Sequence, residues 1–99
     1  MNKPTREQLA ELNGRIAELC GSRGKHPDYT GSLDAIHEVE RSPVISSWLR
    51  YETEVERVVQ EGWREIGVET HYASSFPIHA SAWQRAIALD RTLSNEPLL

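Results

Sequence analysis

The sequence predicts a compact, helix-rich α+β domain of layered type, in which three or four helices surround a small antiparallel sheet. Four stretches of the 99-residue chain repeat apolar residues every three or four positions, which is the spacing of an amphipathic helix. One further region, residues 68–78, contains the alternation of apolar and polar residues that is typical of a strand. We expect a single domain over residues 1–94 and a tail over residues 95–99.

A capping box predicts where the first helix begins. Thr5 takes the N-cap position, and Gln8 stands three residues later, where its side chain reaches back to the cap. The apolar residues behind this box fall on one helical face: Leu9, Leu12, Ile16 and Leu19. Gly21 supplies the stop, because glycine adopts the left-handed conformation in which many helices end.

A glycine-rich loop, GSRGKHPDYTG, follows over residues 21–31 and leads into a second helix. Ser32 caps this helix, and Asp34 lies in its first turn, where the helix dipole favours a carboxylate. Its core-facing residues are Leu33, Ala35, Ile36 and Val39. The pair Ser42-Pro43 ends the helix, because the residue before a proline avoids the helical conformation.

A third helix is predicted to start at Ser46 or Ser47. From Trp48 to Ile66 the apolar residues recur at intervals of three and four. A strand over residues 51–55 is the alternative, because glutamates alternate with apolar residues there. The longer periodicity favours the helix.

The best candidates for strands are residues 68–72, which alternate apolar and polar side chains, and residues 76–78. Pro77 would have to lie at a sheet edge or a strand end, because it cannot donate a ladder hydrogen bond. After this region Ser81 caps a last helix, which runs to Leu93.

The charge balance argues against broad nucleic-acid binding. The formal net charge is −4, with 11 Lys and Arg against 15 Asp and Glu. Affinity for duplex nucleic acid depends on clustered basic side chains, so we expect no duplex nucleic acid as a partner. The overall negative charge does not exclude a basic pocket at one place on the surface.

The single cysteine, Cys20, has no partner for an internal disulfide, and we expect it to be a small buried hydrophobe. The first residues lack the apolar core of a signal peptide, and no run approaches the roughly 20 apolar residues that span a bilayer. We therefore expect a cytoplasmic protein without a membrane partner.

No motif for catalysis or metal binding is present. His37 and Glu38 begin a zinc-helix pattern, but position 41, where the second histidine should stand, is arginine. The chain has no nucleophile elbow and no phosphate-binding loop, and Cys20 has no evident base. We expect no enzyme, no catalytic residue, no metal and no cofactor.

Two blocks of sequence resemble a known family. PDYTGSLDAIHEVER, residues 27–41, and HASAWQRAIALDRTL, residues 79–93, are similar to segments of the phage ABA sandwich domain, a family of small phage and prophage proteins. The matching positions are Pro27, Asp28, Tyr29, Leu33, Ala35, Ile36, His37, Glu38, Glu40, Ala80, Ala82, Gln84, Arg85, Ala86, Ala88, Leu89, Arg91, Thr92 and Leu93.

The resemblance implies a compact layered α+β fold and a phage protein in the host cytoplasm, but no reaction, since the function of the family is largely unassigned. Two departures stand out. Relatives often carry a longer, Trp-containing insertion after the first helix, where this chain has only the glycine-rich loop. Asp90 stands where an apolar residue is expected.

The loop before the second helix, together with that helix, is our candidate for one wall of a ligand site. Arg23 and Lys25 bring positive charge, and Tyr29 offers a ring on which a base can stack. His37 lies one turn into the helix, within reach of a ribose or base edge, and Arg85 is a further candidate contact. In the alternative interpretation these features only cap the helix, and Tyr29 anchors the loop in the core.

Two functions follow as hypotheses. The first is a homo-oligomer, a dimer or a closed ring, that captures a small anionic nucleotide between its subunits, as a phage sponge for an immune signal would. The second is a protein-interaction module that inhibits or recruits a host or phage protein through an apolar surface. At least one of the three tryptophans, Trp48, Trp63 and Trp83, is a candidate to face a partner.

Overall fold

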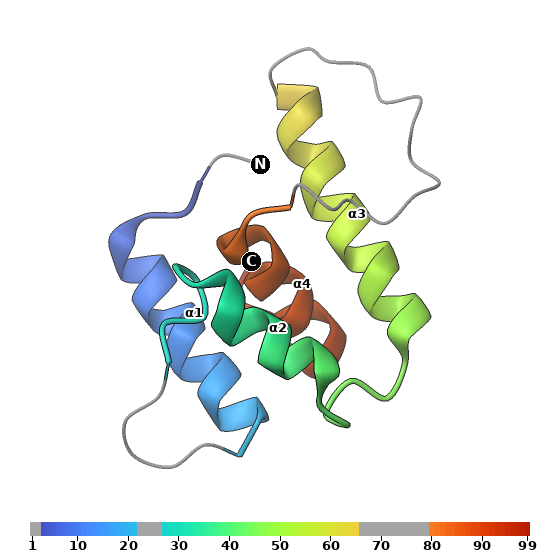
Figure 1. Cartoon of the computed structure of the whole chain (residues 1–99). Helices are drawn as coiled ribbons and strands as arrows, with labels where there is room; N and C mark the ends of the chain where they lie inside the picture. The colour runs from blue at the N-terminus through green and yellow to red at the C-terminus, as the bar shows by residue number, and fades with distance from the viewer. Residues whose placement is uncertain (1–2, 22–26, 66–79) are drawn as a thin grey trace.

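Four helices make up the regular structure in the part of this chain that can be described. The computed structural model describes residues 3–21, 27–65 and 80–99. The helices are α1 (Arg6–Leu19), α2 (Leu33–Arg41), α3 (Trp48–Glu65) and α4 (Ala82–Leu93), shown in Figure 1. The described residues contain no strand. The predicted α+β fold with an antiparallel sheet is therefore wrong: the described architecture is all helical.

The sheet was predicted from short stretches in which apolar and polar residues alternate. Residues 51–55, for which a strand was the alternative, belong to α3, as the longer helical period predicted. Residues 68–72 and 76–78, on which the expected sheet rested, lie outside the described residues. The layered α+β arrangement implied by the family resemblance is likewise not what the described residues form.

The predicted starts of α1, α2 and α4 are confirmed by their capping bonds. Thr5 and Gln8 exchange two hydrogen bonds, of 2.9 and 3.2 Å, across the start of α1. Gly21 follows the end of α1 with a φ of 73°, a conformation that a side chain would strain. Ser32 caps α2, and Ser81 caps α4. Each cap satisfies backbone N–H groups that the first turn of a helix leaves without a partner.

Helix α4 is the centre of the fold. In Figure 1 it lies between α1 and α3, and each of the other three helices packs against it. Seven of its twelve residues are buried: Ala82, Arg85, Ala86, Ile87, Ala88, Leu89 and Asp90. The alanines let neighbouring helices approach closely, while Ile87 and Leu89 fill the space between them.

All four helices contribute side chains to one apolar core. The largest apolar side chains with at most 1% of their surface exposed are Leu12, Ile16, Ile36, Tyr51, Val55, Val58, Ile87 and Leu89. Leu12 and Ile16, and likewise Tyr51, Val55 and Val58, keep the spacing of three and four that predicted their helices, whereas Leu33, which was expected to face the core, is 44% exposed. Within the described residues, no helix has both the length and the apolar character that a membrane crossing requires.

The C-terminal segment, residues 94–99, folds back against the helices. The backbone N–H of Leu98 donates to the Asp90 carboxylate at 2.8 Å. Arg15 of α1 donates to the Ser94 hydroxyl at 3.1 Å and also to the carbonyl of Glu96. Leu98 and Leu99 pack against the core. The residues expected to form a tail are therefore held in place by α1 and α4.

Truncation of a core leucine tests this packing. Leu12→Ala should lower the free energy of unfolding by about 2–5 kcal/mol, because it removes buried methyl groups and leaves a cavity. Leu49→Ala is the matched control, since Leu49 is 74% exposed and its loss should change stability by less than about 0.5 kcal/mol. Urea unfolding followed by circular dichroism measures both. Equal losses for the two variants would contradict the packing described here.

Candidate functional site

Three helices direct polar side chains at one buried carboxylate, that of Glu40 on α2. The Arg85 guanidinium of α4 donates to Glu40 Oε2 at 2.7 Å, and the Tyr51 hydroxyl of α3 donates to the same oxygen at 2.7 Å. His37 Nδ1 lies 2.6 Å from Glu40 Oε1. The side chains of Arg85 and Glu40 are only 6% and 7% exposed. We call these four residues the Glu40 network.

The other three members of the Glu40 network all form hydrogen bonds with the carboxylate of Glu40. A carboxylate only accepts hydrogen bonds, so the proton between it and His37 belongs to Nδ1. Arg85 also donates through Nε to the carbonyl of Ala80, at 3.2 Å. The charge of Arg85 balances that of Glu40, which is how a buried carboxylate is tolerated in a low-dielectric interior.

Burial and this carboxylate together raise the pKa of Tyr51. The phenol is removed from water, which disfavours its ionised form, and it donates its proton to Glu40, whose negative charge opposes a second one. The Arg85 guanidinium acts in the opposite direction but is the weaker influence. Tyr51 therefore stays a neutral hydrogen-bond donor in the folded protein.

The sequence prediction placed His37 and Arg85 in one site, and the structure does bring them together, on opposite sides of Glu40. They belong to a closed structural cluster, however, and neither of them lines the open pocket described below. His37 is the most exposed member, with 45% of its side chain accessible. Tyr51 was missed as a polar partner because the periodicity of α3 marked it only as a core residue, and Glu40 was missed because its partner Arg85 lies 45 positions away along the chain.

The loop residues of the predicted site are placed in part. Arg23 and Lys25 lie outside the described residues, so their role stays a prediction. Tyr29 is 4% exposed and belongs to the apolar core, which favours its alternative role as the anchor of the loop. It lines a small cavity of about 170 Å³ together with Cys20, whose pKa is raised by burial, so that its thiol is a poor nucleophile.

Hydrogen bonds to α1 hold the turn on either side of Tyr29. Asn13 donates through Nδ2 to Asp28 Oδ1 and accepts from the backbone N–H of Thr30, both at 2.9 Å. The Thr30 hydroxyl also donates to the Asp28 carboxylate, at 3.2 Å. These bonds therefore attach the turn that precedes α2 to helix α1.

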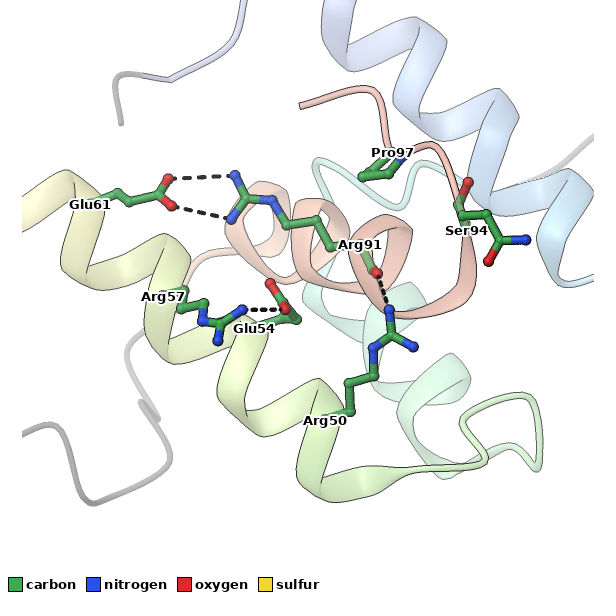
Figure 2. Close-up of a pocket in the computed structure, with 8 residues that line it drawn as sticks. Arg50, Glu54, Arg57, Glu61, Arg91, Ser94 and Pro97 are labelled. Atoms are coloured by element: carbon green, nitrogen blue, oxygen red, sulfur yellow. Dashed lines mark hydrogen bonds and ion pairs between the residues drawn. The ribbon is translucent and has the colours of Figure 1, made fainter.

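An open pocket with a volume of about 440 Å³ lies between α3, α4 and the C-terminal segment. Figure 2 shows its charged side chains, which come from α3 on one side and from α4 on the other. It is lined by Arg50, Glu54, Arg57, Glu61, Arg91, Ser94, Asn95 and Pro97. We call it the α3–α4 pocket.

Helical spacing explains why α3 presents these charges together. Positions 50, 54, 57 and 61 are separated by four, three and four residues, so they share one face of the helix. The core residues Tyr51, Val55 and Val58 lie on a neighbouring face and pack towards α4. This charged stripe was readable from the sequence, but the prediction for this segment rested only on its apolar residues.

Two of the three arginines in the pocket are paired with glutamates. Arg57 contacts Glu54 at 3.0 Å, and Arg91 contacts both oxygens of Glu61 at 3.3 and 3.5 Å. Arg50 donates to the carbonyl of Arg91 at 3.2 Å, and no carboxylate of the described residues pairs with it. Three guanidinium groups against two carboxylates leave the pocket with one net positive charge.

No group of three or more His, Cys, Asp or Glu in the described parts of the chain is placed to hold a metal ion. Comparison of the sequence with models of protein families, with curated proteins and with solved structures finds no match. The resemblance to the phage ABA sandwich domain therefore stays a prediction.

Removal of the Glu40 carboxylate should unfold the network. Glu40→Ala leaves the charge of Arg85 buried without its partner, which typically costs about 3–5 kcal/mol. Glu38→Ala is the control, because Glu38 is exposed on the same helix. Thermal unfolding followed by circular dichroism compares them. If both variants melt together with the unchanged protein, the ion pair does not hold α2 to α4.

The raised pKa of Tyr51 predicts a loss of stability in alkali. An unfolded tyrosine ionises near pH 10, whereas folded Tyr51 resists ionisation. Its contribution is therefore complete below about pH 10 and is lost as the pH rises above this value, because only the unfolded chain releases the proton. Tyr51→Phe should flatten this part of the profile of unfolding free energy against pH.

Absorbance of tyrosinate provides the control for that profile. The chain has three tyrosines, so Tyr51→Phe should remove one third of the tyrosinate signal in urea. In the folded protein near pH 10 the same substitution should leave the signal unchanged. A loss in the folded protein equal to that in urea would show that Tyr51 ionises normally.

Proposed function

We propose that this chain is a small binding protein that holds an anionic, phosphate-bearing ligand in the α3–α4 pocket and releases it unchanged. The observation that carries the proposal is the guanidinium group of Arg50, which is exposed in the pocket and pairs with no carboxylate of the described residues. An anion at this position would supply the missing negative charge.

The shape and chemistry of the pocket support such a ligand. Its volume of about 440 Å³ falls within the roughly 300–1,000 Å³ of small-molecule sites. Guanidinium groups bind phosphate oxygens in pairs, with a geometry that a single ammonium group cannot match. Ser94 and Asn95 add uncharged polar groups at the rim, which suit the hydroxyl groups of a sugar.

In its full form, the proposal is a phage accessory protein that sequesters a nucleotide-type immune signal between the subunits of a homo-oligomer. The phage context of this proposal comes from the resemblance to the phage ABA sandwich domain. The ligand class comes from the charges of the pocket. A sequestering protein has only to bind its ligand and later release it intact, so the proposal requires no catalytic group.

A second candidate is a protein-interaction module, and one observation favours it. Trp48 and Leu49, at the start of α3, are 43% and 74% exposed. Tryptophan side chains often anchor protein partners. This function predicts capture of a protein, with no small molecule released when the chain is denatured.

Calorimetric titration with pyrophosphate and with a cyclic dinucleotide tests the first candidate. Arg50→Ala should weaken the binding of these probes at least about tenfold, because it removes the guanidinium without a carboxylate partner. Arg41→Ala is the matched control, since Arg41 is exposed at the end of α2. Binding should also weaken as salt is raised, because the pocket is open to solvent.

Two results would contradict the proposal. The first is an absence of binding to either probe at low salt. The second is an equal loss of affinity in the Arg50 and Arg41 variants, which would place the anion outside the pocket. Mass spectrometry after heat denaturation completes the test, because a sequestered ligand should be recovered intact.

A further inference from the structure

The charged stripe on α3 is self-complementary when it is reversed. From its N-terminal end it carries Arg50, Glu54, Arg57 and Glu61 on one face of the helix. We propose that a second copy of this chain closes the α3–α4 pocket, with the two α3 helices antiparallel about a two-fold axis. The inference rests on the proposed function, because the second copy would form the other wall of the same ligand pocket.

Antiparallel pairing brings opposite charges together along the whole stripe. Arg50 faces Glu61 of the partner subunit, and Glu54 faces Arg57 of the partner subunit. The two-fold axis repeats both contacts, as it does in every isologous dimer. A parallel arrangement would instead place each residue opposite its own copy, so that like charges would meet. The order of charges thus selects one orientation.

Within one copy Glu54 pairs with Arg57 and Glu61 pairs with Arg91, and each of these groups keeps further donors or acceptors that can contact a second copy. On a single helix Arg50 and Glu54 are four residues apart and could pair. Glu54 instead contacts Arg57, and Arg50 has no carboxylate partner in the described parts of the chain. The side chains of Arg57 and Glu61 are 62% and 40% exposed, so both are accessible to another molecule.

The dimensions of the stripe agree with a helix-to-helix contact. Arg50 and Glu61 are eleven positions apart, which corresponds to about 16 Å along a helix. Glu54 lies deeper, with 13% of its side chain exposed, and the long side chain of an arginine is suited to reach it. The axis would pass beside the middle of α3, near residues 55 and 56.

Closure by a second copy also defines the ligand more narrowly. The two pockets of the dimer together carry two net positive charges, and the guanidinium of Arg50 has further N–H donors besides those that face Glu61 of the partner subunit. A doubly charged phosphate group bound between the two copies matches this balance. The ligand would then lie between the subunits, out of contact with most of the solvent, where its ion pairs are less screened by salt.

A pair of charge reversals tests the dimer directly. Arg50→Glu places two glutamates opposite each other at both ends of the interface, and Glu61→Arg places two arginines there. Each variant alone should run as a monomer in light scattering at micromolar concentration, whereas the unchanged protein should be a dimer. An equimolar mixture of the two variants should form dimers again, because every contact then joins opposite charges. Native mass spectrometry identifies the mixed species.

If dimers form again when the two variants are mixed, the substituted residues contact each other across an interface. A substitution that only disturbed its own chain would not be rescued by the other variant. Circular dichroism shows whether each variant folds, which matters because Glu61 also pairs with Arg91. If Glu61→Arg does not fold, Glu54→Arg and Arg57→Glu form a second pair with the same expected outcome. A monomeric unchanged protein, or folded variants of either pair that stay monomeric on mixing, would overturn the inference.

The two proposals fail in different ways. If the mixed dimer forms but pyrophosphate does not bind, the proposed interface is supported and the proposed ligand is contradicted. If the protein is a monomer and binds pyrophosphate through Arg50, the proposed ligand site is supported and the proposed dimer is contradicted.

Discussion

The described fold depends on two opposite charges that α4 buries. Arg85 and Asp90 are 5% and 1% exposed, and each pairs with a side chain from another helix: Arg85 with Glu40 of α2, and Asp90 with Arg15 of α1. A buried charge without a partner is strongly destabilising, so α4 must take the rotation that satisfies both pairs at once. Every buried side-chain nitrogen and oxygen in the described residues has a hydrogen-bond partner. Hydrophobic burial drives the helices together, and these pairs select one register for α4.

The same constraint shapes the α3–α4 pocket. Asp90 accepts from the backbone of Leu98 as well as from Arg15, and it thereby places the C-terminal segment at the rim. The next residue, Arg91, lies on the part of α4 that meets α3, where its guanidinium reaches Glu61. The carboxylate of Asp90 thus holds together α1, α4 and the segment that follows.

Burial separates the structural charges of this chain from those available for binding. Arg85 and Arg50 were equally plausible anion contacts as residue types, yet the first is enclosed by Glu40 and Ala80. Arg50 is exposed and meets only a carbonyl among the described residues. A ligand or a second copy can gain from the charge of Arg50 without breaking an ion pair of the fold. It would have to disrupt the Glu40 network to use Arg85.

The sequence by itself determined where α1, α2 and α4 begin, because a capping bond joins residues only three positions apart, as in Thr5 and Gln8. It also contained the charged stripe of α3, since helical spacing is a local property. Only the tertiary structure decided which charges are buried and paired. Arg85 and Glu40 are 45 positions apart, and Arg15 and Asp90 are 75 apart. The fold class was wrong for the same reason: local alternation of side chains suggests a strand, but whether a sheet exists depends on pairing with distant segments, which no short stretch of sequence records.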